Sequence, residues 1–241
     1  MTRLRGEKSQ FFLLAVPLVA QEPSHPRARK LVASCDLYRL MNYLLHFFLA
    51  GDDDELRLGN LLGDYVKGRV ERFEHPGLTD RLRTGIQMHR TIDAFSDRHP
   101  AVHRSKRILS AEYGRLSGVI VDVFYDHVLA RRWTEHHPRP LPDYTQEVYR
   151  TLKGNLHRLP APVHPLITSM SRGDWLGGYA SQRGIERALH GMAQRRPVAA
   201  EIGTAGRLLA DHFDRFSVDF DEFLPELRVR CAEFLAERDA G

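Results

Sequence analysis

The fold is decided by helical periodicity, and the stretch that shows it best is Gln87-Met88-His89-Arg90-Thr91-Ile92-Asp93. His89 and Asp93 are four residues apart, so a helix presents both on the same side, and Arg90 is a neighbour of both. An imidazole, a carboxylate and a guanidinium gathered in this way can bind a metal ion and hold a phosphate beside it. An ordinary surface His–Asp pair is the competing interpretation, and other segments must decide between the two.

The segments on either side of this stretch are also helical in pattern. Thr79 is a suitable N-cap for the helix that contains it, and Arg98-His99-Pro100 marks the end of that helix. The preceding segment, residues 58–68, has apolar residues at helical spacing, and Asp64 lies beside its apolar stripe. We therefore expect His89 to face the interior or a cleft, with Asp64 on a neighbouring helix.

The most apolar helix is expected from Gly118 to Trp133. Asp122 and Asp126 are four residues apart on it, close enough to bind one cation together, and His127 follows Asp126 directly. Two carboxylates at this spacing repel each other unless they are exposed, protonated or bound to a metal. A solvated acidic edge beside a core histidine is the structural alternative.

The remaining segments complete an all-α pattern. Helices are expected over residues 102–113, 172–179, 184–192 and 203–237, and the proline-rich segments 138–142 and 160–165 are expected to be loops. Pro225 is expected to kink or divide the last helix. Because no strand pattern or internal repeat is visible, we predict a single helical domain over residues 41–241.

Composition sets broad limits on function. The chain has 241 residues, of which 42% are hydrophobic and 27% charged, as in globular proteins, and its net charge of +4 is compatible with an acidic partner. Cys35 and Cys231 lie far apart, which argues against a disulfide framework or a thiolate zinc site. Nucleic-acid binding is disfavoured because no Lys/Arg stripe with interleaved aromatic residues is visible.

Residues 1–40 differ in pattern from the rest of the chain. A basic start, the apolar run from Phe11 to Ala20 and a polar, proline-containing break have the form of a secretory signal. The run is too short to span a membrane as a helix. We favour a dispensable extension or a mis-assigned start, since a natural pattern begins at Met41, and we accordingly expect a cytoplasmic protein.

The polar residues on these helices point to a common metal site. Burying so many ionisable groups without a cation would cost several kcal/mol each, and carboxylates with imidazoles suit Mn²⁺, Mg²⁺ or Fe²⁺, with Zn²⁺ also compatible. The predicted metal-binding set is Asp64, His89, Asp93, Asp126 and His127, followed by Asp122 and His46.

Five segments together resemble the acyl carrier protein phosphodiesterase family, which is itself similar to a divergent branch of the HD-type metal-dependent phosphohydrolases. They are residues 41–46, 59–68, 86–93, 122–127 and 192–197. The resemblance implies hydrolysis of the phosphodiester that joins 4′-phosphopantetheine to a serine of acyl carrier protein, a step connected to fatty acid biosynthesis, with Mn²⁺ as the expected metal. Phe48 and Gln87 stand where some members carry histidines, so those histidines are not essential here.

The expected mechanism is attack by a metal-activated water. Arg90 is a candidate for bidentate contact with the phosphate, and an unligated histidine, with His89 and His127 among the candidates, would protonate the serine oxygen. Acyl carrier protein is strongly acidic, so basic residues should steer it to the site. The docking candidates are Lys67, Arg69, Arg195 and Arg196. A phosphohydrolase of another substrate, such as a nucleotide, and a non-catalytic carrier-binding helical protein are the alternatives.

Overall fold

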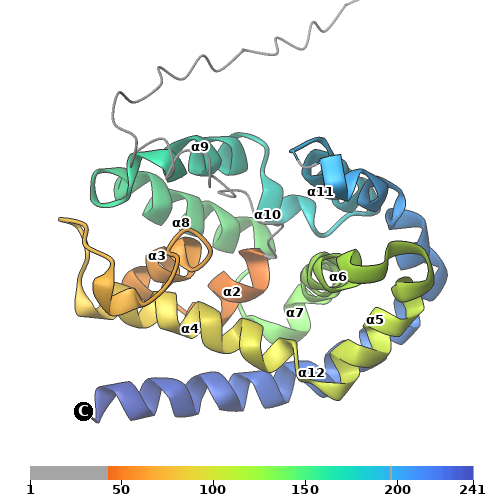
Figure 1. Cartoon of the computed structure of the whole chain (residues 1–241), viewed down its shortest axis with the longest axis horizontal. Coiled ribbons are helices and arrows are strands. Elements are labelled where there is room, and N and C mark those ends of the chain that lie inside the picture. The colour runs from red at the N-terminus through yellow and green to blue at the C-terminus, as the bar shows by residue number, and fades with distance from the viewer. Residues whose placement is uncertain (1–42, 196, 241) are drawn as a thin grey trace, which may run out of the picture. The chain divides into compact units, whose positions relative to one another are not determined.

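The computed structural model describes residues 43–195 and 197–240, and within them the secondary structure is helical, without strands (Figure 1). The α-helices are α2 Tyr43–Ala50, α3 Asp54–Leu62, α4 Asp80–Ser96, α5 Pro100–Tyr113, α6 Ser117–Arg131, α7 Trp133–His136, α8 Leu141–Gly154, α9 His164–Arg172, α10 Trp175–Gly178, α11 Gln182–Arg195 and α12 Gly206–Asp239. Short 3₁₀ turns lie at Val70–Arg72, Gly114–Leu116, Leu156–Arg158, Ala161–Val163 and Pro197–Thr204. The all-α prediction is confirmed.

Helices α3 and α4 form the closest pair in this arrangement. A Cβ atom on Gly59 would clash with the backbone of Leu82 and Gly85, and one on Gly63 would clash with the ring of His89. The glycines of α3 thus let its backbone lie directly against α4. This close approach brings the carboxyl end of α3, and Asp64 just after it, next to His89.

The core is built where α2, α6 and α12 pack together with these two helices. Helix α12 runs along α4, α5 and α6 (Figure 1). Phe216 packs edge-on against Phe124 of α6, and Phe220 packs against Tyr125 in the same way. Helix α2 is buried along almost its whole length, so His46 in its middle is fixed by packing on all sides.

Several predicted helix boundaries agree with the structure. Thr79 caps α4 by accepting a hydrogen bond from the amide of Leu82. Helix α5 ends at Tyr113, before Gly114, whose φ of 49° interrupts the helix. His89 is 2% exposed, which agrees with the expectation that it faces the interior or a cleft.

Other boundaries were wrong. The helix expected to continue to Gly68 ends at Leu62, and the chain turns through residues 63–69. Helix α12 is not divided at Pro225, and its one residue with non-helical φ and ψ is His212. Helix α9 already begins at His164, inside a segment expected to be a loop, because a proline is tolerated in the first turn of a helix. Helix α8 begins at Leu141, inside the other segment expected to be a loop, residues 138–142.

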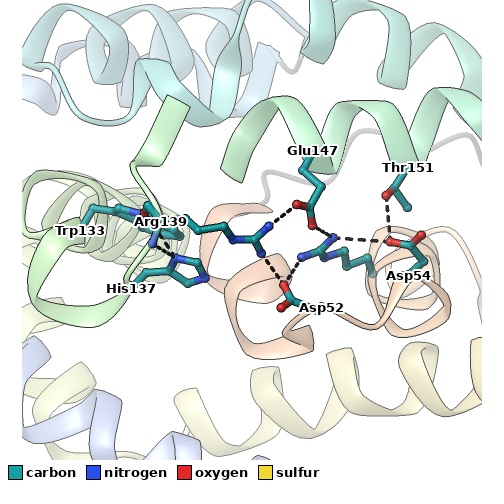
Figure 2. A network of polar contacts seen from close by, with 8 residues as sticks. Asp52, Asp54, Trp133, His137, Arg139, Glu147 and Thr151 are labelled. Atoms are coloured by element: carbon teal, nitrogen blue, oxygen red, sulfur yellow. Dashed lines mark hydrogen bonds and ion pairs between the residues drawn. The ribbon is translucent and has the colours of Figure 1, made fainter. Parts of the chain in front are cut away.

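A buried arginine fastens the start of α3 to α8 (Figure 2). Arg57 is 1% exposed; its Nη1 lies 2.8 Å from Glu147 and 3.4 Å from Asp54, and its Nη2 lies 3.1 Å from Asp52. Arg139 pairs with Asp52 and Glu147 from the other side. We refer to these five residues as the Arg57 network.

No helix in the described part of the chain combines the length and the apolar character that crossing a membrane requires. The predicted signal-like segment, residues 1–40, lies outside the described residues.

Candidate metal centre

Two histidines and an aspartate from α2 and α4 converge at one point. His46, His89 and Asp93 each direct one potential ligand atom there, and these atoms all lie within 4.8 Å of one another. The rings of His46 and His89 stack with centroids 4.2 Å apart. The Nε2 atom of His46 lies 3.4 Å from Asp93 Oδ1, and Nε2 of His89 lies 3.3 Å from Asp93 Oδ2. We call these three residues the His–His–Asp group.

His46 is held by contacts on two sides. Its Nδ1 lies 3.1 Å from Oδ1 of Asn60, a fully buried residue of α3. The first turn of α2 is fixed by Asp126 of α6, whose two carboxylate oxygens accept the amide hydrogens of Leu44 and Leu45 at 3.0 and 2.8 Å. A carboxylate at a helix N-terminus satisfies amides that have no partner within the helix.

His89 is held mainly by packing. Its ring lies against Gly63 and stacks on His46, and its Nε2 lies 3.7 Å from Oδ1 of Asp64. Neither ring nitrogen of His89 makes a hydrogen bond with any residue in the ranges 43–195 and 197–240. Nε2 forms ion pairs with Asp93 at 3.3 Å and with Asp64 at 3.7 Å, but neither has hydrogen-bond geometry, so Nε2 can accept a further partner such as a ligand or water.

The charges of the group are strongly coupled. Burial lowers the pKa of His89, but the carboxylates of Asp64 and Asp93 outweigh it and raise that pKa to about 9. Burial and the neighbouring charge of His89 lower the pKa of His46. The two histidines oppose the effect of burial on Asp93 and hold its pKa well below the usual range. The site therefore pairs a neutral imidazole with a protonated one.

Asp122 lies in the electrostatic neighbourhood of this group. Burial, and next the charge of Asp93, raise the pKa of Asp122 to about 7, while the ammonium of Lys106 acts in the opposite direction. Lys106 itself pairs with Asp97 at 3.0 Å. Asp122 thus faces the acidic side of the site without contributing an atom to the His–His–Asp group.

The structure gives Asp126 and His127 other partners. Asp126 is fully buried, which raises its pKa to about 8 against the effect of the two amides it accepts. His127 donates from Nδ1 to the carbonyl oxygen of Tyr179 at 2.6 Å and meets the ring of Phe213 edge-on. Consecutive residues on a helix point about 100° apart, and in this case they point to different neighbours.

The predicted phosphate and docking residues lie around one loop. Arg90 donates from Nη1 to the carbonyl of Gly68 and from Nη2 to that of Val66, each at 2.7 Å. Lys67 lies between Val66 and Gly68, Arg69 follows Gly68, and both side chains are exposed. Of the other two docking candidates, Arg196 lies outside the described residues, and Arg195 ends α11 with its side chain not described.

Asn60 is the site residue that sequence reasoning missed. The available signal was its spacing: in the helical pattern over residues 58–68, Asn60 and Asp64 are four residues apart and share a face, although in the structure α3 ends at Leu62 and Asp64 lies just after it. Its role nevertheless depends on His46, which lies 14 positions earlier in the chain.

The donor set suits a divalent cation. Two imidazoles and a carboxylate are ligands for Mn²⁺, Fe²⁺ or Zn²⁺, and Nε2 of His89, which makes ion pairs but no hydrogen bond among the described residues, lies where it could bind one. Asp93 remains 50% exposed, so the group is accessible from solvent. The arrangement fits an open metal centre, to which a small part of a larger substrate could be presented.

Comparisons with known proteins confirm the resemblance predicted from the five segments. The family model for acyl carrier protein phosphodiesterase matches residues 41–227. A relative of that name from Yersinia pestis is 35% identical over 188 residues, which cover 78% of this chain and 95% of the relative. Another, from Serratia proteamaculans, is 32% identical over 194 residues, or 80% and 98% of the two chains. No solved structure matches the chain.

Proposed function

This chain belongs to the acyl carrier protein phosphodiesterase family, and we propose that it hydrolyses the phosphodiester between 4′-phosphopantetheine and the serine of holo acyl carrier protein. Water attacks phosphorus, the bond from phosphorus to the serine oxygen breaks, and that oxygen takes up a proton. The products are apo carrier protein and 4′-phosphopantetheine. The observation that carries the proposal is the convergence of His46, His89 and Asp93 on one accessible point.

The proposed cofactor is Mn²⁺, with Mg²⁺ or Fe²⁺ as alternatives, held by the His–His–Asp group. A bound divalent ion would lower the pKa of a water molecule and neutralise charge on the phosphoryl oxygens. Asp64, whose carboxylate lies 3.7 Å from His89 Nε2, stays in the proposed ligand set. Asp122 stays there as a carboxylate on the acidic side of the site, and Asp126 and His127 require the local rearrangement of their present contacts to join it.

Arg90, on α4, is proposed to bind the phosphate of the substrate. A guanidinium has five N–H groups, and Arg90 donates one from each Nη atom to the carbonyl oxygens of Val66 and Gly68. The remaining N–H groups are available to a phosphate oxygen, and the same side chain keeps the loop that follows Asp64 in place. Arg90 thus connects the metal ligands of α4 to the loop that carries Lys67.

The proposed partner is the acidic carrier protein, steered by Lys67 and Arg69. Both residues are exposed on the loop that Arg90 fastens, next in sequence to Asp64. Positive charge at the rim of a site accelerates association with an acidic protein. Arg195 and Arg196 are docking candidates on the basis of the sequence alone. We also propose a cytoplasmic location, as expected for a protein with this partner.

Mass spectrometry of the carrier protein tests the proposal. The full chain is incubated with holo carrier protein and Mn²⁺, and the carrier is then weighed. We expect the mass of the phosphopantetheine group to be lost, and the loss to stop when a chelator removes the metal. Metal-loaded protein that leaves the carrier intact would contradict the proposal; hydrolysis of a nucleotide phosphodiester alone would favour a different substrate, and carrier binding without cleavage would indicate a non-catalytic role.

A further inference from the structure

The two histidines of the site are held in different ways. His46 has a buried side-chain partner on the far side of its ring, Asn60, at 3.1 Å from Nδ1. His89 has no hydrogen-bond partner on either ring nitrogen among the described residues, and it is fixed by Gly63 and by stacking. The orientation and the tautomer of His46 are therefore set by the protein itself.

The orientation of the Asn60 amide follows from its second contact. Its Nδ2 donates to the carbonyl oxygen of Leu56 at 3.0 Å. Rotating the amide by 180° would place its oxygen against that carbonyl, where two acceptors would repel each other. Oδ1 therefore faces His46, and because Oδ1 only accepts, Nδ1 of His46 must carry the hydrogen.

This hydrogen bond determines which nitrogen of His46 can bind a ligand. With the hydrogen on Nδ1, the neutral ring has its lone pair on Nε2, which lies 3.4 Å from Asp93 Oδ1. Asp93 also only accepts and so favours the opposite tautomer, but its contact is longer than the 3.1 Å bond to Asn60 and lacks hydrogen-bond geometry. Asn60 is fully buried, so solvent does not compete for the bond. Histidine ligands of metals are commonly oriented in this way by a partner on the other ring nitrogen.

We propose that Asn60 is a positioning residue, which holds His46 in the Nδ1–H tautomer with Nε2 directed at the metal centre. The proposal rests on the proposed function, because it assigns His46 as a ligand. Asn60 acts only through His46 and makes no contact with the substrate. Its contribution is to fix the orientation and the tautomer of His46 before a metal ion binds.

The first test needs neither metal nor substrate. Nitrogen-15 NMR of the metal-free full chain, labelled at histidine, reports which ring nitrogen of His46 carries the hydrogen. We expect the Nδ1–H tautomer in the wild-type protein. A predominant Nε2–H tautomer would overturn the proposal, whatever the activity of the protein. Conversely, an Nδ1–H tautomer in a protein that leaves holo carrier protein intact would contradict the proposed function and leave this inference standing.

Variants then test the consequence for metal binding. Asn60→Leu removes the acceptor, and we expect mixed tautomers of His46 and Mn²⁺ affinity weaker by about 10- to 100-fold. Asn60→Asp keeps an acceptor oxygen toward His46 and should retain the Nδ1–H tautomer, although the loss of the Nδ2 donor to Leu56 O should lower its stability. Asn155→Leu is the control, because Asn155 Nδ2 donates to Thr151 O four residues earlier, as Asn60 does to Leu56, while its Oδ1 accepts from Arg158 and not from a histidine. Unchanged tautomer and affinity in Asn60→Leu would overturn the proposal. If that variant does not fold, loss of the Nδ1–H tautomer in a folded Asn60→Asp protein would overturn it, since that variant keeps the acceptor oxygen.

Discussion

The two ends of α3 bury charge in opposite ways. At its start, Arg57 is surrounded by three carboxylates, so its Nη groups are satisfied within the protein (Figure 2). At its other end, Asn60 and Asp64 face the His–His–Asp group, where the two ring nitrogens of His89 lack hydrogen bonds within the described chain.

The difference separates a structural cluster from a candidate site. Matched charges hold elements together, here α3 to α8, and leave nothing for a ligand. Metal-ligand atoms that converge on one point, and whose hydrogen bonds within the protein are incomplete, gain the missing interactions when a cation binds. Arg57 Nε, which also lacks a hydrogen-bond partner among the described residues, is a single donor and cannot bind a metal. The comparison predicts that damage at the two ends of α3 has different consequences.

Replacing His89 should have the largest effect on activity. We expect His89→Ala, and the closer-sized His89→Gln, to lower kcat/KM by more than about 100-fold, beyond the usual effect of residues outside the ligand shell. Steady-state assays with holo carrier protein and Mn²⁺ measure it. His99→Gln is the control, since His99 is equally buried but pairs with Glu226 within the protein. Full activity in both His89 variants would remove His89 from the site.

Replacing Arg57 should instead lower stability. Arg57→Leu removes the cation that three carboxylates share, and we expect the free energy of unfolding to fall by about 2 kcal/mol, the scale of a hydrogen bond to a charged group. Asp52 and Asp54 are more than half exposed and can be rehydrated, so the loss stays below that of a fully buried pair. Urea unfolding measures it. A stable Arg57→Leu protein with weakened Mn²⁺ binding would mean that the two ends of α3 are not separate.

The pH dependence of metal binding should follow His89. Its pKa of about 9 in the metal-free protein means that the metal must displace a proton below that pH. Apparent Mn²⁺ affinity should therefore rise by about tenfold per pH unit from 6.5 toward 9 and level off above it. Calorimetry in buffers of different ionisation enthalpy measures both the affinity and the released proton. A pH-independent affinity across this range would contradict the assignment of His89 as a ligand.

The same pKa sets the stability of the metal-free protein. A folded-state pKa raised from 6.5 to about 9 contributes stability that is complete below pH 6.5 and is lost as pH rises through 9. In the presence of chelator, the Tm should fall over that interval, and added Mn²⁺ should restore it most at high pH. A Tm in chelator that rises from pH 6.5 to 9 would show that another group dominates.

The smallest effect is expected at the loop that Arg90 holds. The double variant Lys67→Ala, Arg69→Ala should raise KM for carrier protein about three- to tenfold with kcat nearly unchanged, because exposed charges contribute less than about 1 kcal/mol each. The difference should shrink at high salt, where exposed charges are screened. Lys153→Ala, an exposed lysine on α8, serves as the control. Equal KM values for the double variant and wild type at low salt would place the docking surface elsewhere.

Local properties of the sequence determined much of this protein. Helical periodicity gave the all-α class, Thr79 gave the start of α4, and the spacing of His89 and Asp93 gave two members of the candidate site, since each depends on residues a few positions apart. The five segments also pointed to the family that the comparisons show. The start of helix α8 was assigned to a loop, because the prolines at residues 138–142 suggested one.

Only the tertiary structure decided which polar residues belong together. Asp126 and His127 are as suggestive in sequence as His89 and Asp93, yet Asp126 accepts amides from a helix 82 positions away and His127 donates to Tyr179. His46, at the end of the first of the five segments, joins the group with Asn60 as its second contact. The partner of a side chain depends on which helices pack together. The glycines in and after α3 permit its close contact with α4, but their role can be recognised only when the positions of both helices are known.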